Sequence, residues 1–106
     1  MSFLENLSPD EINIVKHSLR ATVEGSFFPD WEFETLIGVD RGTVKNVQEV
    51  FPLRTVGPEE FVCAVFGSMR NLLGYPHGKD EELTTFVPEG ASAIRSTLDR
   101  LNELTA

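Results

Sequence analysis

Apolar side chains recur every three to four residues along most of this chain, which is the spacing of amphipathic helices. From Ile12 to Val23 this spacing follows Ser8-Pro9-Asp10-Glu11, a sequence typical of a helix start with a capping box and a proline at the first helical position. The pattern predicts a helix over residues 9–24, and we expect Gly25 to end it in a left-handed conformation.

Helix caps and turn residues divide the rest of the chain into further segments. We expect Asp30 and Asp40 to cap two short helices, and Gly38 to end the first of them. Residues 53–56 are expected to form a linker, and their sequence is compatible with an extended conformation. Residues 79–87 are compatible with helix, strand or loop. The predicted helices after the first cover residues 31–37, 41–51, 58–73 and 88–104.

One of these helices is expected to lie at the centre of the fold. Between Phe61 and Leu73, apolar residues cover most of the circumference of the predicted 58–73 helix and leave few positions for water. The sequence therefore predicts an all-α fold. We expect a compact bundle of about five helices with at most a trace of strand, formed by residues 1–106 as a single domain.

Composition and charge narrow the classes of function. With 41% apolar residues in 106 positions, the chain has the composition of a globular domain. Seventeen acidic against nine basic residues give a net charge of −8, which opposes binding to nucleic-acid phosphates. No apolar stretch approaches the roughly 20 residues of a membrane span. Cys63 is the only cysteine, and the N-terminal residues lack the layout of a secretory signal, so we expect a cytoplasmic protein.

One segment nevertheless resembles the helix-turn-helix of bacterial repressors. Residues 30–51 contain two predicted helices joined at a glycine, which can adopt the left-handed turn that the motif needs. The valines of the second helix would pack it onto the first. The positions that carry the resemblance are Gly38, Val39, Thr43, Val44 and Val47.

The resemblance implies a DNA-binding regulator as an alternative function. In that family the start of the second helix enters the major groove, which would place Arg41, Lys45 and Asn46 against DNA. A paired DNA site would also require a homodimer, and the last helix offers Leu98, Leu101 and Leu104 as a contact face for it. The excess of acidic residues makes nucleic acid the less favoured partner.

Four aromatic residues fall within the seven positions from 27 to 33. The favoured interpretation is a wedge of Phe28, Trp31 and Phe33 buried between the first and fourth helices, because aromatic side chains dominate core burial. The alternative leaves Phe27 or Trp31 exposed as an anchor for another protein, since tryptophan is enriched in binding hot spots.

The turn Tyr75-Pro76-His77-Gly78 is the best candidate for a small polar site. A histidine in a tight loop can act as an acid or base, which keeps an enzyme using His77 as a remote alternative. The stronger interpretation is a structural turn with the ring bonded to the backbone. The other histidine, His17, lies far away in the sequence, so no metal site and no cofactor is predicted. Cys63 lies in the apolar helix, where we expect a buried and inert thiol.

Two sequence segments, at 28–33 and 72–78, also resemble those of small uncharacterised bacterial helical proteins. This resemblance implies a compact helical domain and assigns no site. Three hypotheses remain. We favour a non-enzymatic domain that binds another protein over a DNA-binding regulator and over an enzyme. One form of this favoured hypothesis has a basic protein as the partner. The candidate protein-binding residues are Phe27, Trp31, Tyr75 and His77.

Overall fold

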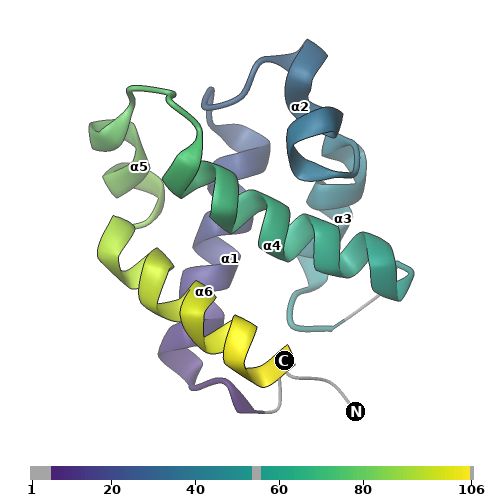
Figure 1. The fold of residues 1–106 in the computed structure, drawn as a ribbon, viewed down its shortest axis with the longest axis vertical. Coiled ribbons are helices and arrows are strands. Elements are labelled where there is room, and N and C mark those ends of the chain that lie inside the picture. The colour runs from purple at the N-terminus through teal and green to yellow at the C-terminus, as the bar shows by residue number, and fades with distance from the viewer. Residues whose placement is uncertain (1–5, 54–55, 106) are drawn as a thin grey trace.

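The computed structural model describes residues 6–53 and 56–105, which form six helices (Figure 1). No strand occurs within these two ranges. The all-α prediction is confirmed, with six helices in place of about five. The helices are α1 (Pro9–Glu24), α2 (Asp30–Ile37), α3 (Arg41–Val50), α4 (Pro58–Gly74), α5 (Asp80–Phe86) and α6 (Ala91–Thr105).

The additional helix is α5, in the segment whose state the sequence left open. Its first turn contains three acidic residues, which interact favourably with the partial positive charge of a helix N-terminus. The last helix begins at Ala91 instead of residue 88, because a turn closed by the N–H of Gly90 on the carbonyl of Val87 separates it from α5. Of the predicted linker at 53–56, residues 54 and 55 lie outside the described ranges.

Two of the predicted helix caps are confirmed. Ser8 accepts a hydrogen bond from the N–H of Glu11 (3.1 Å), and the Glu11 carboxylate accepts one from the N–H of Ser8 (2.8 Å), which completes the capping box of α1. Asp40 caps α3 by accepting hydrogen bonds from the hydroxyl and the N–H of Thr43. These two bonds lower the pKa of Asp40, because they stabilise its charged form.

Two other expectations about helix ends are wrong. The residue that precedes α2 is Pro29, and Asp30 is the first residue of the helix, where its carboxylate pairs with Arg41. Gly25 has an extended backbone and is not left-handed. Its need for glycine is steric, because a Cβ at this position would overlap with the ring of Phe27 and the carbonyl of Ala21. Gly38 is left-handed as predicted, with φ at 101°.

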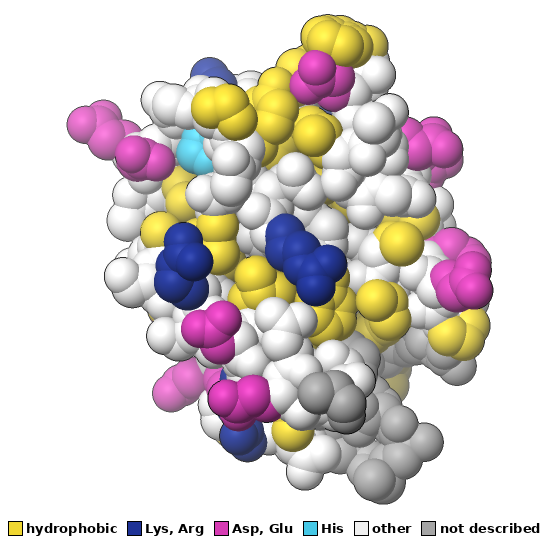
Figure 2. Space-filling view, in the orientation of Figure 1, with side chains coloured by type: hydrophobic (Ala, Val, Ile, Leu, Met, Phe, Trp, Pro, Cys, Tyr) yellow, Lys and Arg dark blue, Asp and Glu magenta, His cyan; other side chains and the backbone are white. Residues whose placement is uncertain are grey.

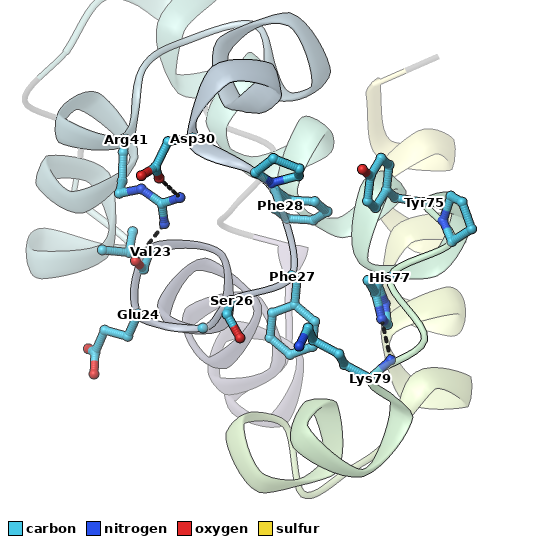
Figure 3. A pocket seen from close by; sticks show the side chains of 13 residues that line it. Val23, Glu24, Ser26, Phe27, Phe28, Asp30, Arg41, Tyr75, His77 and Lys79 are labelled. Atoms are coloured by element: carbon cyan, nitrogen blue, oxygen red, sulfur yellow. Dashed lines mark hydrogen bonds and ion pairs between the residues drawn. The ribbon is translucent and has the colours of Figure 1, made fainter.

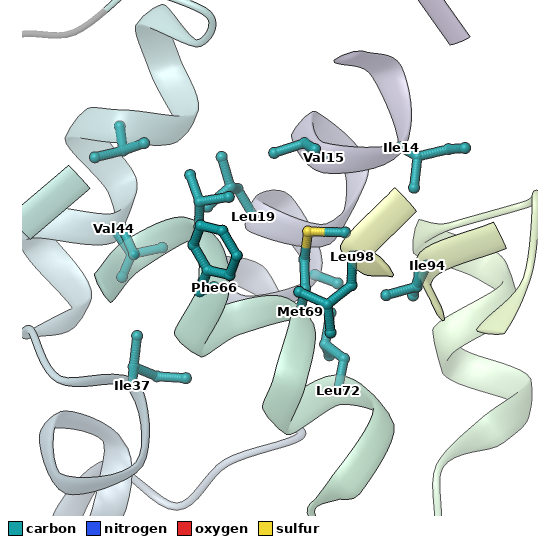
Figure 4. Packing of buried hydrophobic residues seen from close by; sticks show 14 of the residues in the cluster. Ile14, Val15, Leu19, Ile37, Val44, Phe66, Met69, Leu72, Ile94 and Leu98 are labelled. Atoms are coloured by element: carbon teal, nitrogen blue, oxygen red, sulfur yellow. The ribbon is translucent and has the colours of Figure 1, made fainter. Parts of the chain in front are cut away.

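The predicted central position of α4 is confirmed. It packs against α1, α2, α3 and α6, and in Figure 1 it crosses the middle of the molecule. Figure 4 shows the contact between α1, α4 and α6, where apolar side chains from all three helices meet. The core side chains with no exposed surface include Val15, Leu19, Met69, Ile94 and Leu101. Burial of this cluster is the main source of stability for such a fold.

Helix α2 crosses α4 at close range. Gly67 of α4 lies directly beneath the carbonyl of Ile37, and a Cβ at this glycine would overlap with that oxygen. Asn71, one turn further along α4, donates hydrogen bonds to the carbonyls of Leu36 (2.9 Å) and Gly67 (2.8 Å). The C-terminal end of α2 is thereby fixed on the central helix.

The last helix does not offer the apolar face that a dimer was expected to use. Leu98 and Leu101 are buried in the core, and Leu104 is half-buried against it. The expectation that they form a contact face for a homodimer is therefore wrong for the first two, because the same stripe of α6 covers α1 and α4. Within the described ranges, no helix has the length and apolar character needed to cross a membrane.

Candidate functional site

The aromatic segment divides into a buried part and one exposed residue. Phe27, Phe28 and Phe33 are each less than 5% exposed, whereas Trp31 is 80% exposed. The predicted burial is confirmed for Phe28 and Phe33 and is wrong for Trp31. Of the two residues that the alternative left exposed, Trp31 is exposed and Phe27 is buried. Because α2 buries Phe33 and Ile37, one turn apart, position 31 lies on the opposite side of the helix.

The buried rings form the floor of an open cleft of about 670 Å³. One wall is the connection from α1 to α2, and the other is the turn after α4, at residues 75–79 (Figure 3). Phe27 contacts His77 edge-on with ring centroids 4.9 Å apart, and Phe28 contacts Tyr75 in the same way at 5.6 Å. The structure thus brings together three of the four predicted protein-binding residues, Phe27, Tyr75 and His77, and leaves Trp31 outside the cleft.

Tyr75 connects the turn after α4 to α2. Its hydroxyl donates a hydrogen bond to the Glu32 carboxylate at 3.0 Å. This bond raises the pKa of Tyr75 above its ordinary value of 10.0, because ionisation would remove the donor; partial burial and the negative charge of Glu32 act in the same direction. The half-buried ring is therefore part of the structure that supports α2.

His77 has partners at both ring nitrogens. The backbone N–H of Lys79 donates to Nδ1 at 2.9 Å, and Nε2 lies 2.9 Å from the carbonyl oxygen of Leu72. An N–H can only donate and a carbonyl can only accept, so in this arrangement Nδ1 is the acceptor and Nε2 is the donor. A ring that bridges two backbone groups in this way closes the turn and has no nitrogen directed at the cleft.

Arg41, the first of the three residues expected to face DNA, turns toward α1 instead of outward. Its guanidinium donates to the carbonyls of Thr22 (3.0 Å) and Val23 (2.8 Å) at the C-terminal end of α1, and to the Asp30 carboxylate at 2.9 Å (Figure 3). It also lies over the Phe33 ring, 4.3 Å from the centroid. A cation at this position satisfies carbonyls that the helix itself leaves unpaired.

The other two DNA candidates, Lys45 and Asn46, are exposed on α3. Arg41 does not join them in a basic surface, because its charge is directed at Asp30 and at α1. Two helices lie on either side of Gly38, and α3 packs against α1 and α4. The helix-turn-helix arrangement of this unit and its use in DNA binding stay predictions.

The remaining candidate groups are dispersed. His17 pairs with Glu89 at 3.1 Å, whereas His77 bonds to the backbone of Leu72 and Lys79. Cys63 is half-buried, where a buried thiol was expected. Among residues 6–53 and 56–105, no group of three or more histidine, cysteine, aspartate or glutamate side chains lies close enough together to hold a metal ion.

Comparison with known proteins adds no relative to this picture. No family model matches the chain, and neither a curated protein nor a solved structure shows significant similarity to it. The resemblance to small bacterial helical proteins therefore stays a prediction.

Proposed function

We propose that this protein is a non-enzymatic interaction domain that binds another protein through Trp31. The observation that carries the proposal is the 80% exposure of the indole. A tryptophan side chain can bury about 150–250 Å² at an interface, and tryptophan is among the residues most enriched in binding hot spots. A partner that covers it would recover apolar contact that the folded chain leaves in water.

Trp31 is also held in a defined position. The helix that carries it is fixed to the core by Phe33 and Ile37, and the Asn71 amide holds the backbone of its last turn. A side chain on such a rigid helix loses less conformational entropy on binding than one on a mobile loop. Trp31 therefore has both the exposure and the preorganisation of an interface anchor.

The charge of the molecule favours a basic partner. A net charge of −8 creates a long-range field that attracts positively charged proteins and speeds their association. Figure 2 shows hydrophobic side chains gathered over the start of α2, with an acidic side chain directly beside them. We place the protein in the cytoplasm, where the unpaired thiol of Cys63 stays reduced.

The test compares capture of partners by three forms of the chain: wild type, Trp31→Ala and Leu53→Ala. Leu53 is the control, because it is 71% exposed and belongs to the connection between α3 and α4. In Figure 1 the end of α3 that leads into this connection lies away from the start of α2. We expect wild type and Leu53→Ala to retain the same protein from nuclease-treated lysate. That partner is then purified, and its affinity for each variant is measured. We expect Trp31→Ala to bind it at least about thirty-fold more weakly than wild type does, which is the size of a hot-spot loss.

Two outcomes would contradict the proposal. One is equal binding of the purified partner by wild type and by a folded Trp31→Ala variant. The other is retention of DNA that disappears on nuclease treatment and weakens in a Lys45→Gln variant, which would favour the helix-turn-helix hypothesis.

A further inference from the structure

The surface around Trp31 combines an exposed aromatic ring with carboxylates and contains no cation of its own helix. Asp30 precedes the indole, Glu34 follows it by three positions, and α2 contains no lysine or arginine. Residues three apart on a helix lie on the same face, so Glu34 and Trp31 share one face of α2. The side chains of the α2 surface are therefore arranged around a position suited to a positive charge.

Two of the carboxylates near the indole retain free acceptor capacity. Asp30 is 93% exposed and uses one oxygen for Arg41, which leaves the other open to solvent. Glu34 is exposed, and the described part of the chain provides no ion pair for it. The third acidic residue, Glu32, is already bonded to Tyr75. The carboxylates of the helix outweigh the partial positive charge of about half a unit at its N-terminus.

At the border of its buried face, α2 already binds an arginine by the same combination of groups: Phe33 is buried there, whereas Asp30 is 93% exposed. There the guanidinium of Arg41 lies 4.3 Å from the centroid of Phe33 and 2.9 Å from the carboxylate of Asp30, an aromatic ring and a carboxylate three positions apart. Trp31 and Glu34 have the same spacing on the outer side, in the reverse order, with the ring first and the carboxylate three positions later. The inner pair, Asp30 and Phe33, has its arginine from α3. Among the described residues, no arginine is paired with the outer pair, Trp31 and Glu34.

We propose that the outer pair of α2 receives an arginine side chain of the partner protein, with the guanidinium stacked on the Trp31 indole and its N–H groups donating to Glu34 and Asp30. This inference rests on the proposed function and names the chemistry of the partner. Arginine fits better than lysine, because its planar and weakly hydrated head stacks on aromatic rings while it donates several hydrogen bonds in one plane.

The experiment titrates the full chain with short glycine-serine peptides that contain two arginines, and follows the backbone amide signals of α2 by NMR. The same peptide with citrulline keeps the shape of the side chain and removes its charge, and a lysine version keeps the charge and removes the planar head. We expect the arginine peptide to shift the signals of α2 with the highest affinity, the lysine peptide to bind more weakly, and the citrulline peptide to leave the signals unchanged.

Variants locate the binding. Trp31→Leu keeps an apolar side chain without the indole, and we expect it to weaken binding by about two- to five-fold, the range of an exposed cation–π contact. Glu34→Gln should weaken binding by about two-fold or more, whereas Glu81→Gln, which removes the same charge from α5, should have no effect.

Equal loss in Glu34→Gln and Glu81→Gln, equal binding of the citrulline peptide, or no shift of α2 at the highest soluble peptide concentration would each overturn the arginine inference. The two proposals remain separable. A partner that depends on Trp31 but binds no less well after its arginines are replaced would support the proposed function and contradict this inference. Arginine peptides that bind α2, in the absence of any Trp31-dependent partner, would support the inference about the surface and count against the proposed function.

Discussion

Phe28 and Trp31 lie three residues apart in the most aromatic segment of the chain, and the fold treats them in opposite ways. The Phe28 ring is buried and contacts the rings of Phe27, Phe33 and Tyr75, whereas Trp31 is almost fully in solvent. The difference follows from the direction of each side chain, since both are large and apolar. Phe28 is therefore part of the core, whereas Trp31 is exposed on the surface, where a partner protein can contact it.

The largest expected effect tests that separation directly. Phe28→Ala should reduce the free energy of unfolding by about 3–5 kcal/mol, because it leaves a cavity among packed rings. Trp31→Ala should change it by no more than about 0.5 kcal/mol, as for other exposed positions. Chemical denaturation of both variants, followed by circular dichroism, measures the two values. A loss of several kcal/mol in Trp31→Ala would show that the indole is part of the core.

A second, smaller effect on stability is expected from Arg41, which connects α3 to the end of α1 and to the start of α2. Arg41→Met removes the donor to the carbonyls of Thr22 and Val23, and a carbonyl left without a partner costs about 1–3 kcal/mol. Lys45→Met, one turn further along α3, removes an equal charge from an exposed position and should leave stability within about 0.5 kcal/mol of the wild type.

Denaturant midpoints of Arg41→Met and Lys45→Met decide between two roles for Arg41. Equal and negligible losses would contradict its structural role and make it available for a ligand again. A loss in Arg41→Met alone would confirm that its charge serves the contact between α1 and α2, and that the predicted basic surface of α3 lacks its first member.

Much of the fold could be predicted because its signals are local. Ser8 and Glu11 specify the start of α1 within four residues, Asp40 does the same for α3, and Gly38 marks a left-handed turn. Gly25 shows the limit of such reasoning. It follows a helix as a left-handed glycine would, yet its backbone is extended, and the contact that excludes a side chain comes from the Phe27 ring two residues later.

The candidate site was less predictable because its contacts join distant parts of the chain. The exposure of Trp31 depends on which face of an eight-residue helix meets α4, and one pair of buried residues on α2 was too little pattern to decide it. The bond between Tyr75 and Glu32 spans 43 positions, and that between Arg41 and Val23 spans 18. No local signal marks Glu32 as the acceptor for Tyr75, or Arg41 as the cap of a helix that ended earlier.

The smallest expected effect is on the pKa of Tyr75, whose ring is neither fully buried like Phe28 nor exposed like Trp31. Its folded-state pKa is raised above 10.0, so the stabilisation from its bond to Glu32 is complete below pH 10.0 and is lost as the pH rises through the folded-state pKa. Because the chain contains one tyrosine, the ultraviolet absorbance of tyrosinate reports this group alone. Glu32→Gln keeps an acceptor oxygen but removes the charge, and it should move the pKa of Tyr75 back toward its ordinary value. Identical titrations of wild type and Glu32→Gln would show that the carboxylate does not hold this ring, and that α2 is fixed by its contacts with α4 and Arg41 alone.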